Sequence, residues 1–325
     1  MKPLIIAEKP SVALSISRAL GGFRKDSRGF WQSSAYLLAN AVGHVVTLQA
    51  PEDYSPAWKR WSMKSLPIIP QQFGLKVIPR QSKQYHILKM LLDGAPLVIN
   101  ACDAGREGEL IFRWICQLAG YTGPVQRLWI SSLTPQAIRQ GFTQLRGGTE
   151  YDNLGHAARC RAQGDWLVGI NATRAFTVKH RELLSVGRVQ TPTLAMLVAR
   201  EREIQDFQPQ DYWVVTAEFC SAAGVYQGRW FRDKENRVWS WDDAQAIRDK
   251  VQGRLGIVAS VQEKQRREPP PLLWDLTSLQ REANRRWGFS AARTLNSAQK
   301  LYERHKLITY PRTNSRYLTP DIIAS

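Results

Sequence analysis

The 325-residue chain has few cysteines, no long apolar run and neither of the common glycine-rich phosphate-binding motifs. Its four cysteines form no CxxC pair, which argues against a zinc ribbon or a disulfide scaffold and favours reduced thiols in the cytoplasm. No apolar run approaches about 18 residues, and charges interrupt the N-terminal apolar stretch, so we expect neither a membrane span nor a signal peptide. Without GxxxxGK[ST] or GxGxxG, a P-loop ATPase and a dinucleotide-dependent dehydrogenase are disfavoured.

Acidic residues are in deficit, because 45 Lys+Arg against 28 Asp+Glu give a formal charge of +17. The excess is +9 on residues 1–150 and +8 on residues 151–325, so it is not confined to a tail. Such a spread is typical of a long positive surface that faces a polyanion such as nucleic acid, although a generically basic soluble protein has the same count. The 12 Trp, 10 Tyr and 10 Phe supply ample surface for folded domains rather than disorder.

Residues 1–150 have the pattern of an α/β domain with a parallel-sheet core. Short apolar runs predict strands at residues 3–7, 36–48, 75–79, 97–102 and 125–130. Capping and glycine signals predict helices at residues 11–20, 106–118 and from residue 135 onward, with Ser11 and Thr134 as caps. The run at 97–102 is almost continuously apolar, as expected of a strand buried on both faces of a sheet.

The remaining chain divides into three further segments. Residues 151–208 are predicted to be helical (151–180 and 190–204), and residues 209–265 to be β-rich (213–219, 225–231 and 237–241) with a helix at 242–252. A polar connector with three consecutive prolines then marks a boundary. Residues 266–325 begin a second helical domain, with helices predicted at 275–287 and 290–305 behind caps at Asp275 and Ser290.

Acidic residues follow two of the predicted strands. Glu8 follows the first, and Asp103 and Glu107 follow the strand at 97–102, with Glu109 nearby. Since sites form at the carboxyl ends of parallel strands and residues i and i+4 share a helix face, Asp103 and Glu107 suit one hard cation such as Mg²⁺. The alternative is that these acids only complement a helix dipole, which we favour for Glu109 and leave open for the other two.

A series of ordered motifs resembles a known family. IAEKPS, VGH and DAGREGE resemble the Toprim domain of type IA DNA topoisomerases, and WISS, DWLVGIN, GRVQTP and ITYPRTNS follow in that family's order. These motifs begin at Ile6, Val42, Asp103, Trp129, Asp165, Gly187 and Ile308. The set is most similar to the bacterial topoisomerase III branch and covers residues 4–318. The resemblance implies a multidomain, ATP-independent isomerase in the cytoplasm, associated with the nucleoid.

The resemblance implies that Tyr310 is the nucleophile, which cleaves one DNA strand and joins its 5′-phosphate before strand passage and religation. A free tyrosine, with a pKa of about 10, attacks phosphate poorly unless positive charge stabilises the phenolate. In extended chain Arg312 points to the same side as Tyr310, so we expect it to be able to contact the same phosphate. Glu8 and Lys9 match the family pair that assists proton transfer at the leaving 3′-oxygen and neutralises the phosphate.

The resemblance further implies Mg²⁺, bound by Asp103 and Glu107 with Glu8 as a third ligand. Gly105 stands where the family's DxDxE motif has its middle acid, so we expect weaker metal binding than usual. His44, in the VGH motif, is open to either a catalytic or a core role.

The expected partner is single-stranded DNA or underwound duplex. Arg161 and Asp165 match family positions that line the single-strand groove. Three residues of the GRVQTP motif lie near the same path: Arg188, Gln190 and Thr191. Phosphate contacts of this kind bind in a salt-dependent, weakly selective way, while a surface ion pair and a capping turn are the alternatives.

Complete members of the family continue past the nucleophile-bearing domain, whereas this sequence ends at Ser325, 15 residues beyond Tyr310. We therefore expect the N-terminal part of a topoisomerase III-like enzyme, which is either complete in nature or works with a second chain that supplies the C-terminal half. The alternative function is a catalytically incomplete remnant that binds single-stranded DNA.

Overall fold

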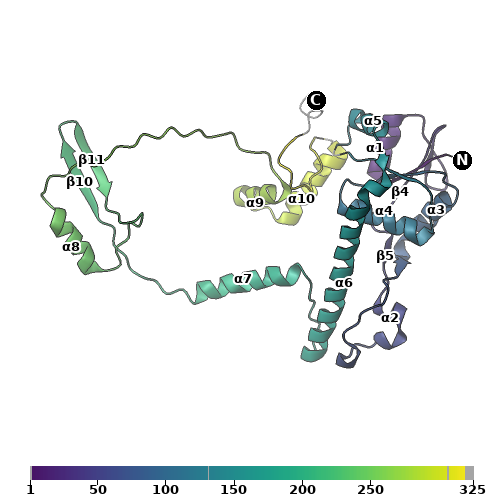
Figure 1. The fold of residues 1–325 in the computed structure, drawn as a ribbon, viewed down its shortest axis with the longest axis horizontal. Coiled ribbons are helices and arrows are strands. Elements are labelled where there is room, and N and C mark those ends of the chain that lie inside the picture. The colour runs from purple at the N-terminus through teal and green to yellow at the C-terminus, as the bar shows by residue number, and fades with distance from the viewer. Residues whose placement is uncertain (1, 131, 306, 319–325) are drawn as a thin grey trace. The chain divides into compact units, whose positions relative to one another are not determined.

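The computed structural model describes residues 2–130, 132–305 and 307–318. These residues form two compact units, Met1–Thr191 with Pro271–Ser325 and, separately, Pro192–Pro270 (Figure 1). The finer division into four segments stays a prediction. Ser131 of the WISS motif and residues 319–325 of the last predicted segment lie outside the described residues.

The excess positive charge belongs to the first unit. Residues 192–270 contain 12 Lys+Arg and 12 Asp+Glu, so the whole charge of +17 falls on Met1–Thr191 and Pro271–Ser325. The positive charge is thus divided evenly between the two halves of the sequence but unevenly between the two folded units. We expect a polyanionic partner to bind the first unit.

A seven-stranded sheet, in the order β2-β3-β4-β1-β7-β8-β9, organises the first unit. Its centre is parallel, as predicted: β1 (Leu4–Ala7) lies between β4 (Leu37–Asn40) and β7 (Val98–Ala101), and β8 (Val125–Arg127) follows β7. The edges are antiparallel and were not predicted, because strands of two residues show no periodicity. They are β2 (Arg24–Lys25), β3 (Trp31–Gln32) and β9 (Arg146–Gly147). The single strand predicted at 36–48 is wrong, because it divides into β4 and β5 (Val46–Leu48), and β5 pairs with β6 (Leu75–Val77) in a separate sheet.

Alternate residues of β1 enter two different cores. Ile5 and Ala7 pack with α1 (Pro10–Leu20) and α5 (Pro135–Thr143), whereas Leu4 and Ile6 belong to the core that includes α3 (Ser82–Leu92) and α4 (Arg106–Ala119). This alternation is the period of two expected of a strand covered on both faces. Helix α3 is absent from the predicted elements, although Tyr85, Leu88 and Leu92 are buried at helical spacing.

Glu8 and Lys9 directly follow β1, so they lie at the carboxyl end of a central strand of the sheet. Helix α1 begins at Pro10, with Lys9 as its N-cap residue and no side-chain cap, so the predicted Ser11 cap is wrong. Proline is favoured at the first helical position because it lacks the N–H that would have no partner there. The caps predicted for the later helices are confirmed, since Thr134, Asp275 and Ser290 each accept an N–H bond from the first turn.

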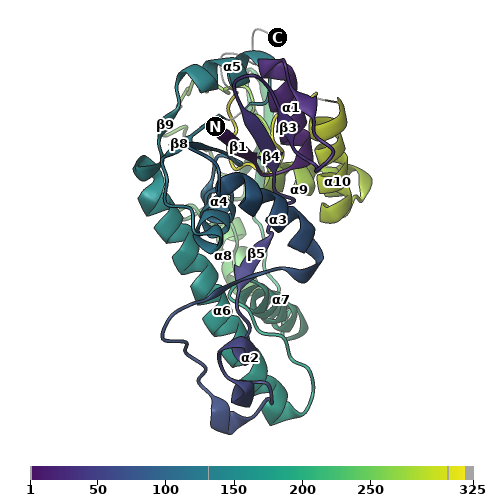
Figure 2. The ribbon, with the colours of Figure 1, turned by 90° about the vertical axis from the view of Figure 1, so that its right-hand side faces the viewer.

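A 29-residue helix, α6 (Asp152–His180), runs past the sheet, and the loop around α2 (Pro51–Tyr54) lies alongside it (Figures 1 and 2). Three side chains of α6 fasten this loop. Trp166 Nε1 donates to the carbonyl of Gln49 at 2.9 Å, Asn171 exchanges two hydrogen bonds with the backbone of Ile68, and Arg174 donates to the carbonyl of Trp58. Short 3-10 helices occupy Pro56–Trp58, Met63–Ser65, Pro79–Gln81 and Gly148–Tyr151.

The first unit also contains α9 (Leu276–Trp287) and α10 (Ala291–Lys300), which continues as a π-helical turn at Leu301–His305. The described residues after this turn, 307–318, include Tyr310 and form no helix or strand. They are fastened to the start of α9, because the Thr313 carbonyl accepts from the Leu276 N–H at 3.2 Å.

The second unit holds most of α7 (Gln190–Gln205), the hairpin β10 (Thr216–Ser221) and β11 (Gly224–Arg229), and α8 (Trp241–Val251). The predicted strand at 237–241 is wrong, since its only pairing is an isolated bridge between Trp213 and Val238. No helix in the described parts of either unit is long and apolar enough to cross a membrane.

Candidate active site

A cavity of about 880 Å³ in the first unit gathers residues from the carboxyl ends of β1 and β7 and from the segment after α10. Among its lining residues are Glu8, Lys9, Asp103, Glu107, Arg161, Tyr310 and Arg312. Every residue predicted to act in catalysis or metal binding therefore contributes to one cavity. Glu8 and Asp103 meet there because β1 and β7 are neighbours in the sheet. Tyr310 and Arg312 enter the same cavity from the segment after α10.

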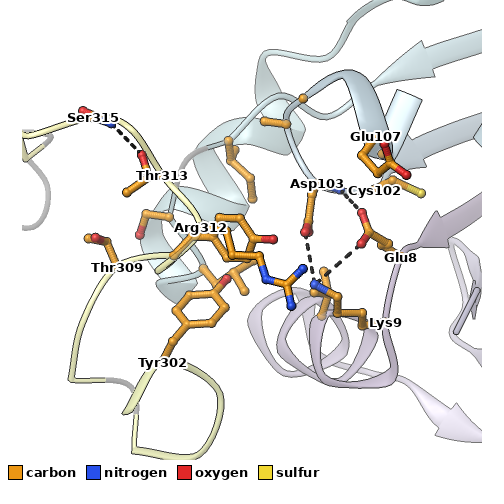
Figure 3. A pocket seen from close by; sticks show the side chains of 18 of the residues that line it. Glu8, Lys9, Cys102, Asp103, Glu107, Tyr302, Thr309, Arg312, Thr313 and Ser315 are labelled. Atoms are coloured by element: carbon orange, nitrogen blue, oxygen red, sulfur yellow. Dashed lines mark hydrogen bonds and ion pairs between the residues drawn. The ribbon is translucent and has the colours of Figure 1, made fainter. Parts of the chain in front are cut away.

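Lys9 lies at the centre of the polar cluster (Figure 3). Its Nζ is 3.6 Å from Glu8 Oε1 and 3.3 Å from Asp103 Oδ2, and it is 5.4 Å from the centroid of the Tyr310 ring. Burial alone lowers the pKa of Lys9, but the charges of Asp103 and Glu8 outweigh it and raise that pKa above its usual value. The ammonium group is therefore a fixed positive charge beside the tyrosine.

Glu8 is a carboxyl group suited to holding a proton. It is 7% exposed, and burial, reinforced by the charge of Asp103, raises its pKa. Lys9 and the Asp103 N–H, which donates to Glu8 Oε2 at 3.3 Å, act in the opposite direction without cancelling the rise. A carboxyl group whose pKa lies above its usual range is a better general acid near neutral pH.

Tyr310 is half-buried, and its ring meets that of Tyr302 edge-on with 5.5 Å between centroids. Burial and then the charge of Asp103 raise the pKa of Tyr310, although Lys9 and Arg312 both lower it. The predicted cations are present, but they do not depress the pKa overall, so the hydroxyl is protonated at neutral pH. Arg312 is exposed and extends towards Lys9 and Asp103 (Figure 3).

The predicted three-carboxylate metal site is not assembled. Lys9 pairs with Glu8 and Asp103, while Glu107 Oε1 lies 2.5 Å from His44 Nε2. In the part of the chain that the structure describes, no three His, Cys, Asp or Glu side chains converge to hold a metal ion. The expectation that Asp103 and Glu107 share a helix face is wrong, because α4 begins at Arg106 and Asp103 lies in the turn before it. The donors nonetheless fit Mg²⁺ chemically, because both residues offer carboxylate oxygens to one cavity and the Glu107 side chain is 67% exposed. His44 is a partner of Glu107 and not a core residue.

Gly105 is not required by the backbone. It is the N-cap residue of α4 with φ 179°, an extended conformation open to any residue, and a Cβ built there meets no atom within 4 Å. Because Gly105 lines the cavity, an aspartate at this position has room to reach the site.

Two buried charged residues were misjudged or missed in the sequence. Glu109 is buried, with Oε1 2.7 Å from Arg113 Nε and Oε2 3.3 Å from Arg127 Nε. It therefore forms ion pairs with two arginines in addition to the predicted position in the first turn of the helix. Arg127 was not predicted at all. The available signal is a charged residue inside a segment predicted to be a strand of the sheet, where burial requires a partner.

The predicted groove residues form a small polar cluster on and beside α6. Asp165 is 3.8 Å from Arg161 and 3.0 Å from Arg188, and a Cβ at Gly164 would lie 3.0 Å from Arg188 Nη1. Two more predicted residues stabilise the adjoining turn: Gln190 donates to Ser185 Oγ at 2.8 Å, and Thr191 Oγ1 accepts from the Gly187 N–H at 3.1 Å. The structure thus brings all five together, and both arginines are exposed.

Known proteins match this chain along its whole length. The sequence model of the Toprim domain matches residues 3–133, and that of the DNA topoisomerase family matches residues 149–325. The chain belongs to the type IA DNA topoisomerase family. The match confirms the Toprim fold and the topoisomerase III-like sequence predicted from the motifs.

Individual topoisomerases agree with this assignment. DNA topoisomerase 3 of Shouchella clausii is 47% identical over 326 residues, covering 99% of this chain and 44% of that protein. DNA topoisomerase 3 of Bacillus subtilis is 44% identical over 324 residues, with the same coverage. The structure of full-length topoisomerase I from Thermotoga maritima superposes with a TM-score of 0.65 and 25% identity, covering 98% of this chain and 50% of that one. The chain thus spans 44% of the length of the two curated relatives and half of the solved structure.

Proposed function

We propose that this chain cleaves single-stranded DNA by transesterification, as the catalytic part of a topoisomerase III-like enzyme. The observation that carries the proposal is the position of Lys9, whose ammonium group lies between two carboxylates and 5.4 Å from the Tyr310 ring. A phosphate that enters this cavity meets a nucleophile, a fixed cation and a proton donor together.

In the proposed cleavage step, Tyr310 Oη attacks the phosphorus, forming an Oη–P bond while the P–O3′ bond breaks. The phenol proton passes to water, and Glu8, whose pKa burial has raised, protonates the leaving 3′-oxygen. Lys9 and Arg312 stabilise the charge on the phosphate oxygens. In religation the 3′-hydroxyl returns its proton to Glu8 and attacks the phosphorus, so that the P–O3′ bond forms, the Oη–P bond breaks and Tyr310 Oη takes a proton from water. One phosphodiester replaces another, so no ATP is needed.

Asp103 and Glu107 are the proposed Mg²⁺ ligands, with Glu8 as an additional candidate. When bound, the ion supplies further positive charge for the phosphate and the leaving oxygen. Glu107 must leave His44 to bind it, which its exposure permits.

The covalent intermediate provides the test. Labelled single-stranded DNA is incubated with the chain and Mg²⁺, then denatured, and we expect a protein–DNA adduct that is absent from Tyr310→Phe. Cleavage is followed rather than strand passage, because the chain spans 44% of its full-length relatives. Tyr302→Phe, which alters the neighbouring ring in the same way, is the matched control and retains the adduct. DNA binding without an adduct would instead support the binding-only alternative.

Restoring the missing acid should tighten metal binding. Because Gly105 has open space and unstrained backbone, we expect Gly105→Asp to fold normally and to lower the Mg²⁺ concentration for half-maximal adduct formation, by about 10-fold if one ligand is gained. Gly105→Asn, which has the same shape without the charge, is the control. An unchanged Mg²⁺ requirement contradicts the proposed ligand set.

The groove residues should contribute phosphate contacts. We expect Arg161→Ala and Arg188→Ala each to weaken binding of a catalytically inactive Tyr310→Phe chain to oligo-dT and to reduce the slope of log K against log salt by about one. Arg28→Ala removes another surface arginine that pairs with an aspartate, at 2.9 Å from Asp26, and serves as the control. Equal slopes of log K against log salt in all three variants would mean that Arg161 and Arg188 contact no phosphate and have only a structural role.

A further inference from the structure

A buried arginine holds the turn that carries Asp103. Arg127, the last residue of β8, is 1% exposed. Its Nη1 donates to the carbonyl oxygens of Asn100 at 2.9 Å and Cys102 at 2.7 Å, and its Nη2 donates to the carbonyl of Asp103 at 2.7 Å. The guanidinium group therefore holds the backbone at the end of β7 and at the start of the turn that carries Asp103, which we call the acidic turn.

The charge of this guanidinium group is balanced from the other side by α4. Arg127 Nε lies 3.3 Å from Glu109 Oε2, and the same oxygen accepts from Asn100 Nδ2 at 3.0 Å. A buried ion pair of this kind is weak support for stability, because apolar residues of similar volume often serve as well. Planar guanidinium, by contrast, fixes several acceptors in one geometry, which suits a positioning role.

The turn is also closely confined. The Cys102 N–H donates to Asn100 Oδ1 at 3.1 Å, and the Asp103 N–H donates to Glu8 Oε2 at 3.3 Å. A Cβ at Gly108 would lie 2.3 Å from the Asp103 carbonyl oxygen, so only glycine lets the first turn of α4 approach this closely. Between Arg127 and α4, the peptide before and after Asp103 has little freedom.

We propose that Arg127 is the positioning residue of the acidic turn, holding the Cys102 and Asp103 carbonyls so that the Asp103 and Glu107 carboxylates reach one divalent cation. This inference rests on the proposed metal-dependent function. Arg127 touches neither the cation nor the DNA phosphate; it acts through the backbone that carries a ligand. Partners that orient ligands typically change metal affinity about 10–100-fold.

Two variants of the full chain separate positioning from folding. Arg127→Lys keeps the buried positive charge beside Glu109 but loses the two-armed contact with the carbonyls. Arg127→Met with Glu109→Gln removes both charges, so that no unpaired carboxylate remains. Arg174→Met is the matched control, because Arg174 is 4% exposed and also donates to a backbone carbonyl, that of Trp58, outside the turn.

Two measurements are made on folded protein, with circular dichroism as the check. Hydrogen exchange by mass spectrometry follows the Cys102 and Asp103 amides, and Mn²⁺, as a probe for Mg²⁺, is titrated by electron paramagnetic resonance. We expect both Arg127 variants to speed this exchange and to weaken Mn²⁺ binding by about 10-fold, while Arg174→Met leaves both within about twofold.

The inference is overturned if the Cys102 and Asp103 amides of a folded Arg127 variant exchange at the wild-type rate. It is also overturned if they exchange faster while the Mn²⁺ affinity is unchanged. A wild-type chain that binds no Mn²⁺ overturns it as well. If the wild type binds Mn²⁺ and the Arg127 variants lose affinity, but no Tyr310 adduct forms, the positioning role stands and the proposed function fails.

Discussion

We expect Lys9→Met to form the covalent adduct about 10²–10³-fold more slowly than the wild type, as when a fixed donor to a developing negative charge is removed. Lys9 is the cation held between Glu8 and Asp103 and beside Tyr310. Without it, the phosphate would approach two carboxylates directly. The loss would also raise the pKa of Tyr310 further, since Lys9 lowers that pKa at present.

The adduct is quantified by single-turnover kinetics with labelled oligonucleotide in excess Mg²⁺. Lys2→Met is the matched control, because Lys2 lies just before the same strand and donates to the Ser33 carbonyl, away from the cavity. We expect it to react within about threefold of the wild type. A Lys9→Met rate equal to that of Lys2→Met would remove Lys9 from the mechanism.

The largest stability effect is expected at Glu109. Glu109→Gln removes the carboxylate that balances Arg127, leaving a guanidinium group that is 1% exposed without its opposite charge. Breaking a buried pair from one side costs about 3–5 kcal/mol, so the free energy of unfolding should fall by that amount. The loss is measured by urea unfolding followed by circular dichroism.

Glu107→Gln is the internal control on the same helix. The Glu107 side chain is 67% exposed, so its substitution should change the free energy of unfolding by no more than about 0.5 kcal/mol. Mn²⁺ affinity should show the opposite order of effects, because Glu107 is a proposed ligand: Glu107→Gln should weaken binding more than Glu109→Gln does. Equal destabilisation by both variants would mean that the buried pair has no special weight.

Local sequence rules predict the proximity of two candidate residues, Glu8 and Asp103. Glu8 and Asp103 follow strands that are neighbours in a parallel sheet, so the strand-end rule predicts that they meet, and they do. Tyr310 had no comparable local signal, since a tyrosine before a proline is commonplace. Its assignment depended on the ordered motifs, and the structure places it beside Lys9.

The pairing of the charged side chains inside the cavity could not be predicted from sequence patterns, because it depends on burial and on contacts between segments that are distant in sequence. Glu107 pairs with His44, 63 positions away, whereas Asp103 pairs with Lys9. The two carboxylates therefore have different partners. The rise in the pKa of Tyr310 comes first from burial, which the motif does not encode. Likewise, the concentration of positive charge in one unit appears only once the chain is divided in space.

The central claim is that Tyr310 becomes covalently linked to the 5′-phosphate of cleaved DNA. The most direct test is mass spectrometry of the peptide adduct after nuclease and protease digestion of the trapped complex. We expect a nucleotide on Tyr310, and none on Tyr302, whose ring lies 5.5 Å away. A nucleotide on Tyr302 or on any other residue, or the absence of an adduct from a chain that binds the oligonucleotide, would contradict the central claim.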